Sequence, residues 1–325
     1  MMSESRAEAE ASARFDLLHS FQSKKPDKIT RQKLGNHMLN PIFGGISGAK
    51  LPIDQYDLGE GAVLRATYAH VMAPFLMAFS PAEPGKHHPA PWSAVKGGLS
   101  YDVHIELMID ATGNPEWLIG TQALWWIAAL LRFRSSWTLS VPIFADRSFQ
   151  LIPKASDARV FPFEIGTRGS IREADEIVDL SMDDLLWVAG TWKRAAYLFH
   201  RERNFAQAFR AFDHSTTIAS PSLGLLTLWG ALEHLFAPSK QELRFRVSAL
   251  IACYLEPSGT GRIQLHKKLL KLYDERSQAA HTANAVEAEA ASETFAVMKN
   301  VLMRIIADDS VPSRDYLEKL LFGAS

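Results

Sequence analysis

The stretch PSLGLLTLWGALEHLF, residues 221–236, decides how the second half of the chain folds. Its side chains are nearly all apolar, and a helix that is apolar all round is buried rather than exposed on one face. Pro238 follows one residue later and ends the helix, because proline cannot continue one. The sequence therefore predicts a central buried helix with other helices packed around it.

Helical patterns flank this segment on both sides. Ser181 and Asp184 form a capping box before an apolar run, which marks a helix start and the beginning of a C-terminal domain. Apolar residues then recur at helical spacing to the end of the chain, which predicts a bundle of four or more helices over residues 181–325. The expected stripes are Leu186, Ala189, Trp192 or Lys193, and Ala196; Phe205, Ala208, Phe209 and Phe212; and Phe295, Met298, Leu302 and Ile305.

The preceding residues, 51–168, read as a mixed domain of strands and helix. YDVHIELMI at 101–109 alternates apolar and polar side chains, which is typical of a half-buried strand. Residues 62–68, 71–79 and 137–144 are further strand candidates, and Pro74 interrupts the second. The apolar run 123–131 predicts a buried helix that is too short to span a bilayer and is closed by Arg132. The fold class is therefore α+β, with an N-terminal mixed domain and a C-terminal all-α bundle.

Residues 1–50 are expected to form an arm with a short helix over 8–20. A basic polar stretch follows at 23–28, and glycines cluster at 44–48. The glycine segment lacks the spacing of a phosphate-binding loop, so a flexible arm or turn is the prediction. Residues 167–170 read as the connection between the two domains.

Composition limits the classes of function. The chain has 325 residues, 47% of them hydrophobic, enough for two domains. A formal net charge of -1 gives no overall basic excess, so any contact with RNA must come from a local patch. The single cysteine, Cys253, lies in an apolar helical run and is expected in the core. With no signal peptide in the polar N-terminus, we expect a cytoplasmic protein that does not enter a membrane.

Histidines in the first half provide the only suggestion of a metal site. His87 and His88 are adjacent in a loop rich in proline and glycine that is expected over residues 81–98, and His70 and His104 lie elsewhere. No cysteine, His-x-x-x-His or His-Glu-x-x-His pattern accompanies them, so the sequence predicts neither a metal nor a cofactor.

The segment LLKLYDERSQAAHT, residues 269–282, carries the candidate chemistry. Arg276 and His281 stand five positions apart, with Ser277 beside the arginine. Successive helical residues turn by about 100°, so the two side chains point about 140° apart. If they act together, they must border a groove, a helix end or a seam between subunits.

This segment resembles the Arg-x(4–6)-His signature of HEPN domains, and in particular the ApeA-like HEPN group. In that group the signature follows an aliphatic helix with Leu-Glu-x-Leu, here Leu232–Leu235, and a basic amphipathic helix, here residues 242–252. The resemblance covers about the last 140 residues. Thr282 replaces a frequent glycine, and Ala283 replaces the tyrosine of HEPN toxins that pair with a nucleotidyltransferase antitoxin.

The resemblance implies a metal-independent RNA endonuclease, a toxin or antiphage defence effector in which two domains pair so that two motifs meet. RNA supplies the ribose 2′-hydroxyl as nucleophile, histidine transfers protons near neutral pH, and arginine stabilises charge on the phosphate. Arg276 and His281 fit these roles and Ser277 adds a hydrogen bond. The expected assembly is a homodimer through the C-terminal bundle.

Two alternatives remain open. The carboxylate of Glu233 lies in a very apolar helix and therefore needs a partner. Its role is either structural, as an ion pair with Arg244, Arg246 or Arg276, or functional, as the group that orients Arg276 at a site. In the first case the bundle is a non-catalytic scaffold for dimerisation or for binding RNA or another ligand. The second alternative to a ribonuclease places the function in the N-terminal half, as a sensor of an unidentified ligand or protein.

Overall fold

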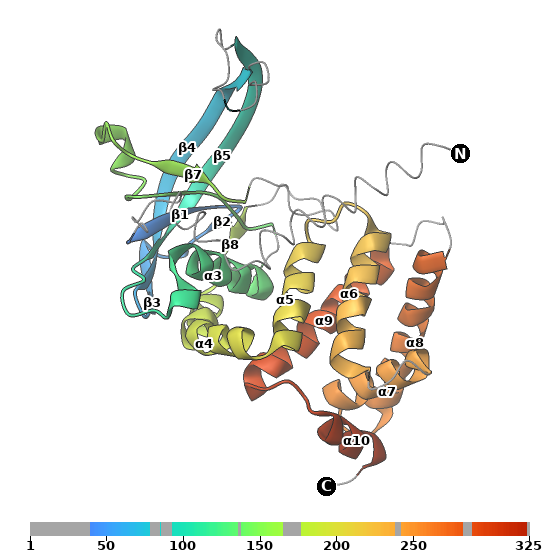
Figure 1. The fold of residues 1–325 in the computed structure, drawn as a ribbon. Coiled ribbons are helices and arrows are strands. Elements are labelled where there is room, and N and C mark those ends of the chain that lie inside the picture. The colour runs from blue at the N-terminus through green and yellow to red at the C-terminus, as the bar shows by residue number, and fades with distance from the viewer. Residues whose placement is uncertain are drawn as a thin grey trace. The chain divides into compact units, whose positions relative to one another are not determined.

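A six-stranded antiparallel sheet in the order β3-β4-β5-β1-β6-β7 forms the first layer of the fold (Figure 1). The computed structural model describes residues 40–78, 85, 93–135, 138–164, 177–237, 242–281 and 288–323, without the side chains of 73–78, 93–99 and 281. The expected helix at 8–20, the basic stretch at 23–28, His87, His88 and the connection at 167–170 lie outside these residues. The strands are β1 (Ile42–Ser47), β2 (Ala49–Lys50), β3 (Gln55–Gly59), β4 (Ala62–Ala78), β5 (Ser93–Ile109), β6 (Ser140–Ala145), β7 (Val160–Pro162) and β8 (Val178–Asp179).

The glycine-rich segment is a strand in the middle of this sheet, so the prediction of a flexible arm or turn is wrong. β1 pairs with β5 on one side and with β6 on the other. A Cβ atom at Gly44 would overlap Leu124, and one at Gly45 would lie 2.8 Å from Val103 Cγ2. The glycines therefore allow side chains to pack directly on the backbone of the strand.

The two strand candidates on either side of residue 70 form a single strand. β4 pairs with β5 along most of its length, and its register shifts between Ala66 and Ala69 and between Ala73 and Phe75. The second shift brackets Pro74, whose nitrogen cannot donate to a ladder, so proline is accommodated at an irregularity. β5 begins at Ser93, and the end of the loop expected over 81–98 is therefore strand.

Helix α3 (Gly120–Arg134) confirms the predicted apolar helix and joins the sheet to the remaining helices. Its N-terminal turn lies against β1, where a Cβ at Gly120 would stand 3.0 Å from Ile42 Cδ1. On its other side the indole of Trp126 donates to the carbonyl of Trp192 at 2.8 Å. The indole of Trp192 donates to the carbonyl of Leu58 at 3.1 Å, so buried tryptophans connect strand β3, α3 and the first bundle helix.

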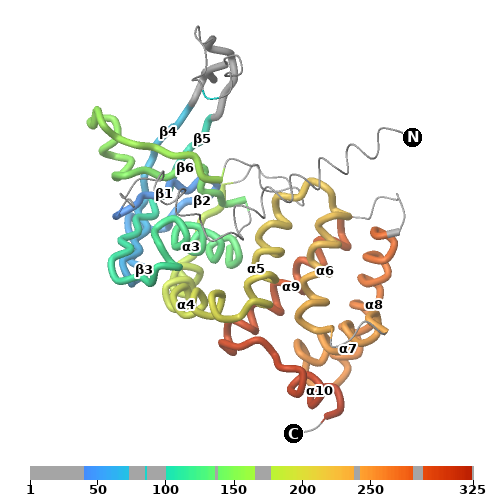
Figure 2. Tube along the Cα trace, viewed as in Figure 1, coloured from blue at the N-terminus to red at the C-terminus, as the bar shows by residue number. Residues whose placement is uncertain are grey.

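Seven helices follow (Figures 1 and 2). The predicted capping box is confirmed. The Ser181 side chain accepts a hydrogen bond from the backbone N–H of Asp184, and the Asp184 side chain accepts one from the backbone N–H of Ser181. Helix α6 contacts α5, α7, α8 and α9, which confirms its predicted central position. The described helices of this part are α4 (Met182–Arg201), α5 (Arg203–Ser215), α6 (Pro221–Phe236), α7 (Leu243–Leu255), α8 (Thr260–His281), α9 (Ala288–Asp308) and α10 (Arg314–Phe322).

The predicted phenylalanine stripe forms the core between these helices. Phe205, Phe209 and Phe212 are buried, and Phe212 stacks on Phe295 of α9 with ring centroids 4.2 Å apart. In the stripe predicted for α4, Trp192 and Ala196 are buried as expected, but Leu186 is 58% exposed and its neighbour Leu185 is buried instead. None of the described helices combines the length and apolar character needed to cross a bilayer.

Candidate functional site

The arginine of the predicted motif is held by the carboxylate in the central helix. Arg276 Nη2 on α8 lies 3.1 Å from Glu233 Oε1 and donates to Glu233 Oε2 at 3.3 Å. The two side chains are 25% and 18% exposed, so the pair lies at the edge of the bundle rather than in its core. Of the three arginines considered as partners for Glu233, the structure brings Arg276 to it.

Two aromatic rings fix this ion pair. The hydroxyl of Tyr273 donates to Glu233 Oε1 at 3.0 Å, and the Arg276 guanidinium carbon lies 5.4 Å from the Tyr273 ring centroid. Trp229 of α6 packs edge-on against Tyr273 at 5.0 Å. Burial and the adjacent Glu233 raise the pKa of the Tyr273 hydroxyl, which therefore remains a donor at neutral pH. The guanidinium is thus oriented by both a carboxylate and a ring face.

Part of the Arg276 guanidinium has no partner among the described residues. Its Nε atom is buried and makes no hydrogen bond there. A buried N–H without an acceptor is unfavourable, so an acceptor that reached this nitrogen would be stabilised.

The other two arginines pair elsewhere. Arg244 donates to both oxygens of Asp274 at 2.6 and 2.7 Å, and these hydrogen bonds lower the pKa of the Asp274 carboxyl. Arg246 lies 3.7 Å from Glu242 on its own helix. Asp274 stands two residues before Arg276 on α8, about 200° around the helix, so the pair of Arg244 and Asp274 lies on a different face of α8 from the Arg276 guanidinium.

Ser277 and His281 complete the motif along the same helix. Ser277 is partly buried next to Arg276, and α8 continues without interruption to His281, its last residue. The side chain of His281 lies outside the described part of the structure. Helical geometry places its Cα about 7.5 Å along the axis from that of Arg276 and about 140° around it. Within one chain, therefore, the two residues leave α8 in different directions.

A second aromatic and basic group lies farther back on α8. His266 packs edge-on against Phe245 at 5.4 Å, and Phe245 is 56% exposed. Burial, and then the charge of Arg244, lower the pKa of His266. Lys268 pairs with Glu293 at 2.6 Å and Lys267 is exposed, so the basic spot predicted at 266–268 is partly neutralised within the fold.

A hollow of about 360 Å³ lies between α7, α8 and α9. The residues that line it include Leu255, Leu265, Val297 and Arg304. Arg276 does not line this hollow. Among the described residues, no three His, Cys, Asp or Glu side chains are grouped so that they could hold a metal ion.

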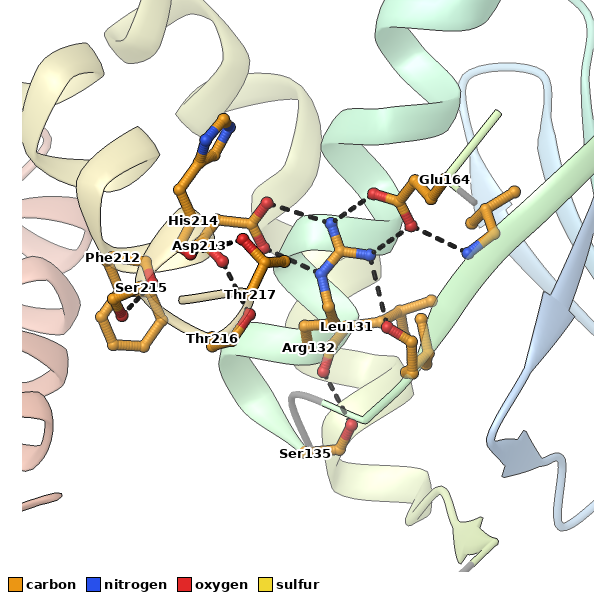
Figure 3. Close-up of polar contacts among 12 residues, drawn as sticks. Leu131, Arg132, Ser135, Glu164, Phe212, Asp213, His214, Ser215, Thr216 and Thr217 are labelled. Atoms are coloured by element: carbon orange, nitrogen blue, oxygen red, sulfur yellow. Dashed lines mark hydrogen bonds and ion pairs between the residues drawn. The ribbon is translucent and has the colours of Figure 1, made fainter. Parts of the chain in front are cut away.

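A buried cluster of charged side chains was missed by sequence reasoning (Figure 3). Arg132 of α3 lies 2.8 Å from Asp213 of α5 and 3.0 Å from Glu164, and it also donates to the carbonyl of Leu139 at 3.4 Å. Burial alone would lower the pKa of Arg132, but the two carboxylates outweigh it and the net shift is upward. Arg132 was read only as the end of an apolar run. Its partners are 81 and 32 residues away, so no local pattern announces them.

Comparison with known proteins assigns no family to this chain. No protein-family model, curated protein or solved structure matches it.

Proposed function

We propose that this chain is an endoribonuclease of the HEPN type that cuts RNA without a metal ion. The observation that carries the proposal is the orientation of Arg276 by Glu233 and Tyr273, at a partly exposed position on the helix that ends at His281. The expected role as a toxin or antiphage defence effector comes from the resemblance to the ApeA-like group and belongs to the same proposal.

Arg276 is suited to hold a phosphodiester. Guanidinium keeps its charge at any physiological pH and can donate two hydrogen bonds to one phosphate group. Glu233 engages Nη2 at one end of the guanidinium, and the Arg276 side chain is still 25% exposed, so a phosphate oxygen has access to part of the cation. Holding the cation in place before the substrate arrives removes a reorganisation cost from the reaction.

His281 supplies the proton transfer in this mechanism. A neutral imidazole removes the proton of the ribose 2′-hydroxyl, whose oxygen attacks the adjacent phosphorus. The bond to the 5′-oxygen breaks, and a protonated imidazole gives that oxygen its proton. The products are a 2′,3′-cyclic phosphate and a free 5′-hydroxyl.

This chemistry needs a base and an acid, and one arginine and one histidine in the motif of a single chain are few for both roles. Arg276 and His281 also diverge by about 140° on α8, and the hollow between α7, α8 and α9 is not lined by Arg276. A second copy of the chain would provide both the second histidine and the opposite wall of a cleft. We therefore place the active site at a two-fold seam between bundles, which makes the enzyme a homodimer.

A non-catalytic scaffold is the second candidate. It is favoured by the same ion pair, because an arginine that is 25% exposed and bound to Glu233 and Tyr273 also serves as a structural tie between α6 and α8. In that case the bundle mediates dimerisation or binds RNA or another ligand without cleaving it.

The deciding experiment incubates purified full-length protein with end-labelled RNA in EDTA. We expect cleavage with cyclic phosphate ends, and a loss of about 100-fold or more in His281→Ala and in Arg276→Ala. His200→Ala, at the exposed end of α4, is the matched histidine control and should cut normally. Unchanged cleavage by His281→Ala would remove this residue from the mechanism, and binding without cleavage by the wild type would favour the scaffold.

A further inference from the structure

Three side chains on the long β4–β5 ribbon form a chain of contacts from a carboxylate through an imidazole to a hydroxyl. His70 of β4 lies between Asp102 and Ser100 of β5 (Figure 1 shows the two strands). Asp102 Oδ1 is 2.7 Å from His70 Nδ1, and Ser100 Oγ is 3.3 Å from His70 Nε2. With hydrogen on Nδ1, the ring donates to the carboxylate and its Nε2 accepts from the serine hydroxyl.

Strand pairing explains this arrangement. His70 is directly opposite Asp102, and Met72 is opposite Ser100. Ser100 and Asp102 are two residues apart on one strand, so their side chains leave the same face of the ribbon. The His70 side chain leaves this face too, because His70 is the cross-strand partner of Asp102. The order of contacts is therefore set by the backbone register.

Further contacts orient the carboxylate. The hydroxyl of Tyr68 donates to Asp102 Oδ1 at 3.4 Å, and the ring of His104 lies 6.0 Å from that of Tyr68. The hydrogen bond with His70 is the main cause of a lowered pKa of Asp102, to which His104 and Tyr68 also contribute. Asp102 is therefore ionised at neutral pH and holds the hydrogen of the imidazole on Nδ1.

We propose that Ser100 is a nucleophile activated by His70, with Asp102 as positioning residue, and that this site cleaves activated carboxylic esters. A serine–histidine–aspartate group is recognised by its geometry and roles rather than by sequence order. Here the carboxylate contacts Nδ1 and the hydroxyl contacts Nε2, as the chemistry requires. The inference is independent of Arg276 and His281.

The reaction has two balanced steps. Ser100 Oγ transfers its proton to His70 Nε2 and bonds to the acyl carbon; the ester C–O bond then breaks, and the leaving alcohol takes that proton. Water next gives a proton to the same nitrogen and attacks the acyl-serine. The acid leaves, and Ser100 Oγ recovers its proton from His70.

The surroundings determine the class of substrate. The side chains of His70 and Asp102 are 43% and 52% exposed, so a small ester can reach the hydroxyl from solvent. Within the cluster, the hydrogens of Tyr68 and His70 are directed at Asp102, and that of Ser100 at His70. The side-chain donors of Tyr68, His70 and Ser100 are therefore not directed at the place where an oxyanion would form. Esters with good leaving groups, such as aryl esters, are therefore the expected substrates.

The test treats folded full-length protein with a fluorophosphonate probe and locates the adduct by peptide mass spectrometry. We expect labelling at Ser100, reduced by about 100-fold in His70→Ala. Labelling at Ser100 should be absent in urea-denatured protein and unchanged in Ser292→Ala, a variant of an exposed serine on α9. Hydrolysis of 4-nitrophenyl acetate should follow the same order among the variants, whose folding is checked by circular dichroism.

Asp102→Asn tests the positioning role separately. Removing the charge next to the imidazole should slow labelling at Ser100, and Asp102→Glu, which keeps a carboxylate, should restore part of the rate. Absence of labelling at Ser100 in the folded wild type would overturn the proposal. Labelling that persists in His70→Ala would also overturn it, because Ser100 would then react as an ordinary exposed hydroxyl.

Discussion

Arg276 and Glu233 form an ion pair across the contact between α8 and α6, with Arg276 Nη2 3.1 Å from Glu233 Oε1. The Glu233 carboxylate also accepts a hydrogen bond from the hydroxyl of Tyr273, which lies one helical turn before Arg276. One acidic side chain therefore both ties two helices together and orients the cation of the motif. The catalytic and the scaffold hypotheses make the same claim about this contact and differ in what its loss would do to RNA cleavage.

Removing the carboxylate should separate these two effects. Glu233→Ala leaves the partly buried Arg276 and the Tyr273 hydroxyl without their acceptor, and we expect the free energy of unfolding to fall by about 1–2 kcal/mol. Cleavage of RNA should fall by at least about 10-fold, because the guanidinium loses its orientation. Urea unfolding and a cleavage assay measure the two effects.

Glu233→Gln is the graded comparison, because an amide oxygen still accepts from Tyr273 but carries no charge. Glu318→Ala is the control for a surface pair, since Arg314 and Glu318 are 67% and 49% exposed and their loss should change little. Full cleavage by a clearly destabilised Glu233→Ala would mean that the ion pair is structural only.

Mixing two inactive variants tests whether the active site is shared between chains. Arg276→Ala and His281→Ala are each expected to be inactive as homodimers. In a mixed dimer, the common cleft would contain one intact arginine and one intact histidine, and we expect part of the wild-type cleavage to return. The measurement is cleavage after the variants are unfolded together and refolded. No recovery in samples that native mass spectrometry shows to contain mixed dimers would contradict a shared site.

The contact between Arg244 and Asp274 should make stability depend on pH in the acidic range. Hydrogen bonds from Arg244 lower the pKa of Asp274 below its ordinary value of 3.8. A carboxyl with a lowered pKa in the folded state contributes stability above its unfolded pKa, and this contribution is lost as pH falls through the folded value. Asp274→Asn should therefore have a lower urea midpoint than wild type at pH 7.

This difference should shrink below about pH 4 and vanish at more acidic pH, as Asp274 becomes protonated in the wild type. Both side chains are about half exposed, so added salt should also reduce the difference at pH 7. A difference that stayed constant from pH 7 to pH 3 would show that the charge of Asp274 is irrelevant to the fold.

Local patterns in the sequence were sufficient to predict the helices. The capping box at Ser181, the apolar run over residues 221–236 and the stripe through Phe205 and Phe209 each depend on residues within a few turns of one another. The position of Leu186 shows the limit of such patterns. Leu185 and Leu186 are both apolar, and only packing against neighbouring elements buries the first and exposes the second.

Features that depend on distant partners were not predictable in the same way. Gly44 and Gly45 are typical of a loop until helix α3 and Val103 are seen to pack on their backbone. For Glu233 the sequence indicated that a partner was needed, and the fold selected Arg276 from three arginines. His70 and Ser100 come together through strand register, which a pattern of single residues does not contain.

The buried ion pair between Arg132 and Asp213 provides the last prediction. Arg132 is 2% exposed and Asp213 is 4% exposed, and they join the helix packed on the sheet to a bundle helix (Figure 3). Arg132→Met takes the counter-charge from two carboxylates in a place where water cannot replace it. We expect the free energy of unfolding to fall by about 3–5 kcal/mol, measured by urea denaturation.

The second variant determines how much of this loss belongs to the pair. Arg132→Met combined with Asp213→Leu no longer contains that unpaired aspartate, so the double variant should be more stable than the sum of the two single losses predicts. We expect a coupling energy of about 2–3 kcal/mol, since the residues are in direct contact. Additive losses would mean that Asp213 is stabilised by its other neighbours. In that case Arg132 would contribute to the fold mainly through Glu164 and the carbonyl of Leu139, which it also contacts.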